Sequence, residues 1–255
     1  MNAPATPARP IAVVTGASSG IGAATARTLA AQGYEVICAA RREERLREIA
    51  DEIGGHVQVC DVTDEASVQA LAAAAGPRVE LLVNNAGGAL GLAPVEDADL
   101  DNWQQMYDMN VLGAARVTRA LTPALLAAEG GRGQVVFVTS VAADGGYEGG
   151  AGYCGAKAAE RAMTQAMRLE MYDRPLRVVE IAPGMVRTDF SLVRFDGDQE
   201  RADKVYQGVE GVLTAEDVAS CIGFVASLPA HVNIDRMVVR PRVQPAAHKI
   251  LRAEE

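Results

Sequence analysis

The sequence predicts an α/β fold built on a parallel sheet. Short apolar runs alternate with longer helical patterns along the whole chain of 255 residues, which is typical of βαβ units. The first apolar run also leads into a glycine-rich turn and then directly into a helical pattern. A chain of this length suits one large domain with a sizeable core. We therefore expect a loose tail at residues 1–10 and a single domain at 11–255, with a substrate lid near 186–212.

The N-terminal part of the chain supplies four strand-like runs. They lie at residues 11–15, 34–40, 56–60 and 80–84. Helical patterns follow the first three runs and end near residues 32, 53 and 75. This order of strand and helix is expected for the crossover connections of a parallel sheet.

The C-terminal part continues in the same order. Helical patterns are expected at 100–126 and 214–228, and strands at 134–139, 177–181 and 236–240. The polar stretch at 190–211 is too long for a minimal connector. We expect it to form either a substrate lid or a disordered loop.

The composition argues against several kinds of partner. With a formal net charge of −9, the chain suits neither nucleic acid nor an anionic membrane, since both attract clustered Lys and Arg. Alanine-rich runs such as 72–75 and 124–128 are far shorter than a membrane span. The first ten residues contain no apolar h-region, so we expect no signal peptide and a cytoplasmic protein.

The sequence does not indicate metal or thiol chemistry. Its four cysteines are scattered without any C-x-x-C spacing, which argues against a disulfide framework or a zinc site. Cys154 follows Tyr153 directly, but no histidine lies near it in sequence to activate a thiol nucleophile. We expect small buried thiols and no metal.

The glycine-rich turn is a candidate phosphate site. It reads GASSGIG at residues 16–22 and joins a strand to the beginning of a helix. Unpaired amides and the helix dipole face such a turn, and glycines let a phosphate approach the backbone closely. Alone, the turn could be a simple tight connection, but the strand before it and the helix after it favour a nucleotide site.

Two arginines indicate which nucleotide binds. Arg41 and Arg42 follow the second strand, where dinucleotide-binding proteins carry an acid for a ribose 2′-hydroxyl or an arginine for a 2′-phosphate. Ala40 stands at the position of the acid, and a guanidinium suits bidentate phosphate contact. We therefore predict NADP rather than NAD. The alternative is that both arginines simply begin a solvated helix.

Polar residues after the later strands each have two interpretations. Asp61 could contact an adenine or cap the following turn. The turn at 84–87, NNAG, could support a cofactor or be an ordinary turn. Asn110 interrupts an apolar helical pattern, which indicates an internal hydrogen bond or a bend.

The stretch from Ser140 to Lys157 contains the candidate catalytic residues. Ser140 ends an apolar strand, so its hydroxyl should lie at the carboxyl edge, where parallel sheets bind ligands. Tyr153 and Lys157 are four residues apart and would share one face of a helix. An adjacent ammonium lowers the pKa of a phenol, which would make Tyr153 a better acid or base at neutral pH. A lone pair of this kind could instead be a surface tyrosine packed on a lysine stem.

Together these motifs resemble the short-chain dehydrogenase/reductase family. The resemblance covers nearly the whole chain and rests on TGASSGIG at 15–22, NNAG at 84–87, Asn110, Ser140, Tyr153, Lys157 and PG at 183–184. It implies a Rossmann-like doubly wound parallel sheet of about seven strands with helices on both faces, an NAD(P) cofactor and a homotetramer. By the same resemblance Ser140 positions the substrate oxygen and Tyr153 transfers the proton. Lys157 would bind the nicotinamide ribose and tune Tyr153, and Asn110 would support a water relay.

We expect the cofactor to contact residues between the glycine-rich turn and the segment after residue 183. They are Gly16, Ser18, Ser19, Ile21, Arg41, Arg42, Asp61, Val62, Asn84, Ala86, Gly87, Tyr153, Lys157, Pro183, Gly184, Val186 and Thr188.

Further motifs resemble a narrower group, the NADP-dependent 3-hydroxy acid dehydrogenases. They are GGALG at 87–91, SLVRFDGD at 191–198, KVYQG at 204–208, LTAEDVA at 213–219 and LPAHVNID at 228–235. That group oxidises serine, L-allo-threonine and related 3-hydroxy acids or reduces malonic semialdehyde. The resemblance implies hydride transfer between NADP(H) and carbon 3 of a small acid or its semialdehyde.

The carboxylate of such a substrate needs a partner. Arg194 in the expected lid is our candidate, because an arginine fork matches a carboxylate, and Ser140 and Tyr147 complete the expected substrate site. Two features depart from the group's pattern: Gly146 replaces a common proline, and Glu148 would repel an acidic substrate if it faced the pocket. Alternative substrates are a neutral ketone, a secondary-metabolite aldehyde or a 3-oxoacyl thioester. A further alternative is a nucleotide-sensing protein without catalysis.

Overall fold

One sheet of seven parallel strands organises the computed structural model, which describes residues 9–253. The strands are β1 (Ile11–Thr15), β2 (Glu35–Ala40), β3 (His56–Val59), β4 (Leu81–Asn84), β5 (Gly133–Val138), β6 (Leu176–Pro183) and β7 (Arg236–Val239). They lie in the order β3-β2-β1-β4-β5-β6-β7, and all neighbours pair in parallel. The predicted parallel α/β sheet is confirmed. Most of the predicted tail, residues 1–8, lies outside the described residues.

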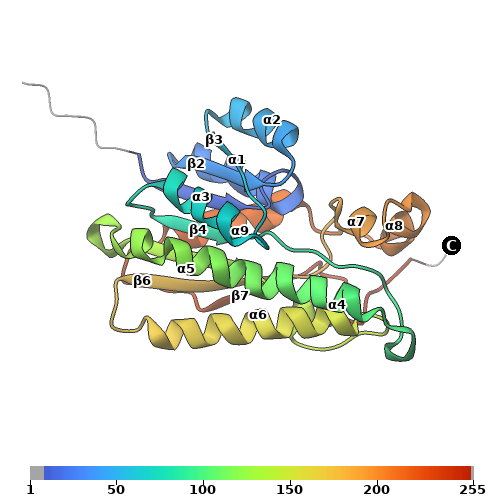
Figure 1. The fold of residues 1–255 in the computed structure, drawn as a ribbon. Helices are drawn as coiled ribbons and strands as arrows, with labels where there is room; N and C mark the ends of the chain where they lie inside the picture. Colours follow the sequence, from blue (N-terminus) through green and yellow to red (C-terminus); the bar gives the residue numbers. More distant parts are fainter. Residues whose placement is uncertain (1–8, 254–255) are drawn as a thin grey trace, which may run out of the picture.

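Helices cover both faces of the sheet (Figure 1). One layer contains α1 (Gly20–Ala31), α2 (Glu43–Ile53) and α9 (Ala215–Ser227). The other contains α3 (Glu65–Ala75), α5 (Gly113–Leu126) and α6 (Ala151–Glu170), and α4 (Leu100–Tyr107) packs on α6. Short 3₁₀ turns, η1 (Val95–Asp97), η3 (Glu129–Gly131) and η4 (Val141–Ala143), complete the connections.

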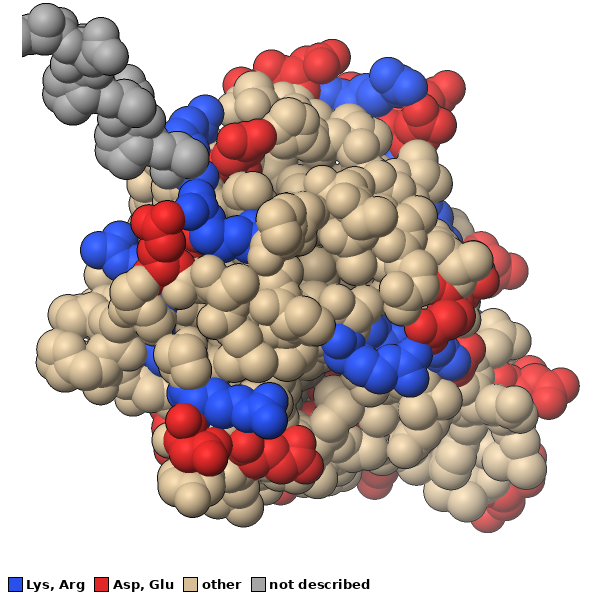
Figure 2. All heavy atoms as spheres, turned by 60° about the vertical axis from the view of Figure 1, so that its left-hand side comes forward, with Lys and Arg blue, Asp and Glu red and all other residues tan. Residues whose placement is uncertain are grey.

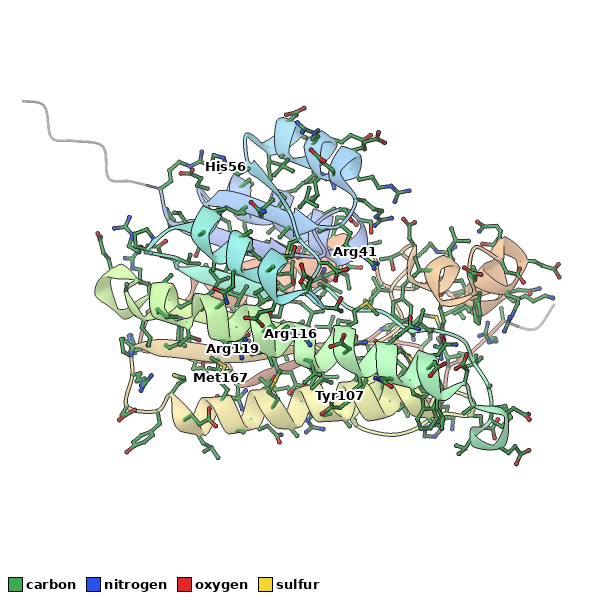
Figure 3. All side chains as sticks on the ribbon, in the orientation of Figure 1. Arg41, His56, Tyr107, Arg116, Arg119 and Met167 are labelled. Carbon is green, nitrogen blue, oxygen red and sulfur yellow. The ribbon has the colours of Figure 1, made fainter. Side chains whose placement is uncertain are left out.

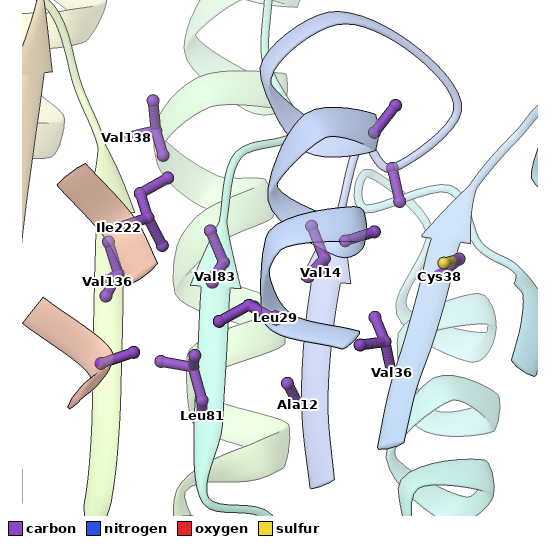
Figure 4. Close-up of a cluster of buried hydrophobic side chains, with 14 of the residues drawn as sticks. Ala12, Val14, Leu29, Val36, Cys38, Leu81, Val83, Val136, Val138 and Ile222 are labelled. Atoms are coloured by element: carbon purple, nitrogen blue, oxygen red, sulfur yellow. The ribbon is translucent and has the colours of Figure 1, made fainter. Parts of the chain in front are cut away.

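Two cores lie on the two faces of the sheet. Ala12 and Val14 of β1 belong to the cluster on the α1 side, which also contains Leu29 (Figure 4). Val13 points the other way and belongs to the cluster with Leu71 of α3. Because both faces are covered, neighbouring positions of one strand are all apolar. This explains why the sequence shows apolar runs and no alternation of polar and apolar residues.

The crevice for a ligand lies between β1 and β4. The chain runs outward from β1 to β3, returns to β4 beside β1 and then continues in the opposite direction to β7. Such a reversal leaves space outside the carboxyl ends of the two central strands. Thr15 connects these ends, because its hydroxyl donates to the carbonyl of Val83 and accepts from the amides of Asn85 and Ala86.

Two segments add detail to their prediction, and a third, residues 241–253, had no predicted structure. The helix expected at 100–126 is divided into α4, a π-helical turn η2 (Asp108–Leu112) and α5. The segment at 190–211 is ordered and contains two short helices, α7 (Phe190–Arg194) and α8 (Gln199–Tyr206). After β7, residues 241–253 return to the side of α8 (Figure 1), where the amide of Ala253 donates to the carbonyl of Gly208.

Charges of both signs share the surface. On the face in Figure 2, Lys and Arg lie beside Asp and Glu over several elements. Some of these charges form ion pairs between helices, such as Arg27 with Glu52 and Arg119 with Glu65. Within residues 9–253, no helix has both the length and the apolar character needed to cross a membrane.

Candidate active site

A cavity of about 1380 Å³ opens at the carboxyl edge of the sheet. Its walls come from the glycine-rich turn, the ends of the central strands, α7, α8 and the C-terminal segment. Every residue predicted to contact the cofactor lines this cavity except Asn84. Asn84 is buried beside the sheet, where its Nδ2 donates to the hydroxyl of Thr118 at 2.8 Å. Its neighbour Asn85 lines the cavity instead.

The glycine-rich turn is shaped by close backbone contacts. Gly16 has a φ of +68°, a conformation that side chains with a Cβ rarely adopt. A Cβ on Gly22 would lie 2.3 Å from the carbonyl oxygen of Gly16. Asn85 holds the turn from the other side by donating to the carbonyl of Thr15 at 3.0 Å. The turn is therefore fixed in place before a ligand arrives, with the N-terminus of α1 facing the cavity.

Three arginines gather beside this turn. Arg42 donates from Nη2 to the hydroxyls of Ser18 at 2.9 Å and Ser19 at 2.7 Å. Figure 3 labels Arg41 after β2, on the side of the molecule where α7 and α8 lie. Burial lowers the pKa of Arg42, and the positive charges of Arg45 and Arg41 lower it further. A cluster of like charges of this kind favours an anionic ligand.

Asp61 has the capping role that was one of its two interpretations. Its Oδ1 accepts hydrogen bonds from the amide of Thr63 at 2.9 Å and from the Thr63 hydroxyl at 2.7 Å. Asp61 also lines the cavity. Burial raises the pKa of Asp61, but the Thr63 hydrogen bonds and the nearby Arg41 and Arg116 lower it more. The residue stays ionised while it fixes the turn after β3.

The structure brings Ser140, Tyr153 and Lys157 together at the end of β5. Tyr153 and Lys157 lie one turn apart on α6, and both are buried. The Ser140 hydroxyl faces Tyr153 and accepts from the amide of Ala142 at 3.1 Å. Phe190 of α7 packs edge-on against the Tyr153 ring, with the ring centroids 5.5 Å apart. The alternative of a surface tyrosine on a lysine stem is therefore excluded.

The pKa of Tyr153 differs from its expected direction. Burial raises it above the ordinary value of a phenol. The Lys157 ammonium and the Ser140 hydroxyl oppose this rise, as expected, but do not overcome it. Desolvation disfavours the phenolate, and the depth at which the ring is buried depends on packing that a local motif does not report.

Sequence reasoning missed the partner of Lys157. The ammonium donates to Oε2 of Glu160 at 2.7 Å and to the carbonyl of Val138 at 3.1 Å. Burial lowers the pKa of Lys157, but Glu160 and Tyr153 raise it more, so the net shift is upward. Glu160 follows Tyr153 and Lys157 on the same face of α6, at the spacing i, i+4 and i+7. That spacing is the signal that could have found it.

Asn110 makes the internal hydrogen bonds that were one of its two interpretations. It lies in the π-helical turn and is fully buried. Its Oδ1 accepts from the amide of Gly88 at 3.2 Å, and its Nδ2 donates to the carbonyls of Gly88 at 2.9 Å and Met106 at 2.7 Å. A Cβ on Gly87 would lie 2.5 Å from this Oδ1 and 3.6 Å from Nζ of Lys157. Asn110 thus lies behind Gly87, close to Lys157, and does not itself line the cavity.

Arg194 and Tyr147 form the predicted substrate end of the cavity. Arg194 donates from Nε to the carbonyl of Gly91 at 2.8 Å and from Nη1 to the Tyr147 hydroxyl at 3.0 Å. Its guanidinium carbon lies 6.0 Å from the centre of the Tyr153 ring. The arginine is therefore held inside the cavity next to Tyr153. It is not a surface arginine on a mobile loop.

Two residues near Arg194 and Tyr147 had open roles: Glu148 could face the pocket, and Cys154 could be a nucleophile. Glu148 lines the cavity, and its side chain is exposed. Cys154 is buried, and burial raises the pKa of its thiol, which disfavours the nucleophilic thiolate.

The C-terminal segment also contributes to the site. Gln244 lines the cavity, and its Oε1 accepts from the amide of Met185 at 2.7 Å. No pattern in 241–253 indicated this role, because contacts between distant segments leave no periodic trace in a sequence.

Comparison with known proteins agrees with this geometry. A family model described as short chain dehydrogenase matches residues 10–198. An uncharacterized oxidoreductase of Mycobacterium tuberculosis is 58% identical over 239 residues, covering 94% of each chain. Serine 3-dehydrogenase of Agrobacterium fabrum is 44% identical, covering 90% of this chain and 92% of its own. Among solved structures, the closed form of serine dehydrogenase complexed with NADP+ matches with a TM-score of 0.88 and 36% identity, covering 96% of this chain and 100% of the other.

Proposed function

This chain belongs to the short-chain dehydrogenase/reductase family of oxidoreductases, and from that premise we propose that it transfers a hydride between NADP(H) and a small 3-hydroxy acid or its semialdehyde. The observation that carries the proposal is the position of Arg194, which lies inside the cavity beside Tyr153. The homotetramer implied by the resemblance stays a prediction.

The nucleotide site fits a phosphorylated dinucleotide. The rigid turn at 16–22 offers backbone amides to a pyrophosphate, and Arg41 and Arg42 offer positive charge to a 2′-phosphate. The NADP+ complex of the similar serine dehydrogenase supports the same choice of cofactor. When bound, NADP(H) supplies or accepts the hydride at its nicotinamide ring.

The proton chemistry belongs to side chains of this chain. We assign Ser140 to hold the substrate oxygen next to the Tyr153 hydroxyl. Tyr153 then takes the alcohol proton during oxidation or gives a proton to the carbonyl oxygen during reduction. Lys157 supplies the positive charge that limits the rise of the Tyr153 pKa. Asn110 stays a positioning residue, since it supports Gly87 from behind.

The substrate carboxylate is assigned to Arg194. Two nitrogens of its guanidinium are held by Gly91 and Tyr147, and among the described residues Nη2 has no hydrogen-bond partner. A carboxylate between Nη2 and the Tyr147 hydroxyl would be held close to Tyr153. Carbon 3 of a small acid is separated from its carboxylate by a single carbon, which suits this short path.

A second candidate class of substrate follows from the position of Glu148. Its carboxylate at the cavity wall disfavours a simple anion and favours a substrate with an ammonium group or no charge. An amino-bearing 3-hydroxy acid such as serine offers both charges, to Arg194 and Glu148 respectively. A neutral secondary alcohol carries neither charge, so it would pair with neither Arg194 nor Glu148.

The test is a panel of substrates in which turnover is monitored as the reduction of NADP+. It compares serine, L-allo-threonine, 3-hydroxypropionate and 3-hydroxyisobutyrate with neutral secondary alcohols of similar size. We expect turnover of the acids, and we expect Arg194→Ala to raise KM for them by about 10- to 100-fold while changing KM for the alcohols little. Arg201→Ala is the matched control, because Arg201 lies on α8 over the Phe195 ring and does not line the cavity. Activity on the neutral alcohols alone, or equal effects of Arg194→Ala on both classes, would refute the carboxylate site.

A further inference from the structure

A buried carboxylate sits on the inner side of the Tyr153–Lys157 pair. Glu160 is 1% exposed, and its Oε2 accepts from Nζ of Lys157 at 2.7 Å. Lys157 is 4% exposed, and its other recorded partner is the carbonyl of Val138. The positive charge of Lys157 is therefore paired with Glu160 on one side, while Tyr153 lies on its other side. This contact has no role in the mechanism described above.

Other charged groups surround Glu160. Burial raises the pKa of Glu160, Lys157 opposes this rise, and Glu180 of β6, also 1% exposed, adds to it. Glu180 is itself held by the Thr139 hydroxyl at 2.8 Å and by Nε of Arg236 at 3.1 Å. Arg161 reaches from α6 to the far oxygen of Glu180 at 3.9 Å. Arg161 and Arg236 also pair with Asp144, so these two cations are shared between two carboxylates, and Lys157 is the cation that hydrogen-bonds to Glu160.

On the far side of Lys157, Tyr153 faces two cations and one anion. Lys157 and Arg194 lower its pKa, whereas Glu160 raises it. In a buried site the effect of a nearby charge is much larger than in water, because little solvent screens it. A carboxylate bound to the lysine therefore cancels part of the lysine's effect on the phenol.

We propose that Glu160 is a positioning residue that holds the Lys157 ammonium, partly neutralises it, and keeps Tyr153 protonated at neutral pH. A protonated phenol is the form that gives its proton to a carbonyl oxygen, so the site is set to reduce an aldehyde or ketone near pH 7. Oxidation of the alcohol needs the phenolate and gains rate only at higher pH. The inference rests on the proposed function of this site, and it adds the direction of the reaction that the site favours.

Replacing Glu160 with glutamine changes the pKa of Tyr153 through Lys157. Glu160→Gln removes the anion but keeps an amide oxygen near Nζ, and the Val138 carbonyl stays in place. The phenolate of Tyr153 also stabilises the ammonium. The charge of Lys157 then acts on Tyr153 without an opposing anion, so we expect the pKa of Tyr153 to fall.

The experiment measures this pKa in two ways. The first is the ultraviolet absorbance of tyrosinate in a pH titration without substrate, taken as the difference between each protein and the same protein carrying Tyr153→Phe. The second is the pH profile of kcat/KM for alcohol oxidation with NADP+. We expect Glu160→Gln to move both midpoints to lower pH by about one unit, which is roughly a tenfold gain in oxidation below the midpoint.

Two further variants separate this role from a structural one. Glu160→Asp keeps the charge, so its midpoint should stay within a few tenths of a pH unit of the parent. Glu170→Gln removes an exposed carboxylate near the end of the same helix and should change nothing. Thermal unfolding and NADPH fluorescence titration verify that each variant is folded and binds the cofactor.

An unchanged tyrosinate midpoint in Glu160→Gln would overturn the proposal, since it would mean that Glu160 exerts no charge on Tyr153. A shift to higher pH would also overturn it, because Glu160 would then serve to keep Lys157 charged. The tyrosinate titration needs no substrate, so a failure of the proposed hydroxy acid substrate leaves this test intact.

Discussion

Replacing Arg42 with alanine tests the predicted choice of NADP over NAD. Arg42 is exposed beside the glycine-rich turn, and its fork already makes hydrogen bonds to Ser18 and Ser19. A bound 2′-phosphate would add a charge-assisted contact, which contributes about 1.5–2 kcal/mol at a site that solvent partly screens. Losing it corresponds to a roughly 10- to 30-fold weaker binding of NADPH. NADH lacks this phosphate and should bind almost unchanged.

The assay is fluorescence titration of both reduced cofactors at two salt concentrations. We expect the preference for NADPH to fall in Arg42→Ala, and to fall further in Arg41→Asp, which also introduces a repulsive charge. The affinity of the parent protein for NADPH should decrease with salt more steeply than its affinity for NADH. Arg47→Ala is a matched control on α2, since Arg47 is exposed and pairs with Glu43. An equal loss of NADPH and NADH affinity in Arg42→Ala would refute this reasoning and assign Arg42 only to holding the turn.

Three other substitutions give expected outcomes. Gly22→Ala should weaken NADPH binding by roughly an order of magnitude or more in the same titration, because the new Cβ would meet the carbonyl oxygen of Gly16 at 2.3 Å and displace the turn. Thr214→Ala removes the side chain that caps α9 and should reduce the free energy of unfolding in urea by about 1 kcal/mol without changing kcat. Lys157→Ala should move the rise of oxidation to higher pH by about one unit or more, since the ammonium that lowers the pKa of Tyr153 is gone, and an unchanged pH profile would contradict this electrostatic role.

Most of the fold could be predicted because its signals are local. The apolar runs at 11–15 and 34–40 lie within a residue of β1 and β2, and the helix expected to end near 53 ends at Ile53. Each of these elements is marked by its own apolar residues and by a glycine or arginine at its end. The π-helical turn at Asp108–Leu112 could be placed only roughly, through Asn110, because its cause is a set of hydrogen bonds to Gly88 in a distant loop.

The nucleotide half of the site could be predicted better than the substrate half. The turn at 16–22 and the arginines after β2 line the cavity as expected, because motif and strand order together fix their place. Asn84 is the exception, because its side chain donates to Thr118, while Asn85 lines the cavity. Neighbouring residues at a strand end point to opposite faces, and a motif of two asparagines does not say which one faces the ligand.

The substrate half depends on contacts between segments far apart in the chain. Arg194 could be named from its chemistry, but its position depends on Gly91, which is 103 residues away. Phe190 and Gln244 also reach the cavity, from α7 and from the C-terminal segment, and neither was expected there.

The pKa of Tyr153 illustrates how burial changes the meaning of a motif. A tyrosine and a lysine one turn apart predict a lowered pKa if both are taken as partly solvated. In the structure the ring is buried, and the lysine is bound on its other side by Glu160, so the net shift is upward. The same glutamate on an exposed face of α6 would be screened by water and would hardly affect the phenol. The direction in which this site works best thus depends on which face of α6 is covered by β5 and β6, and that is decided by the packing of the whole sheet.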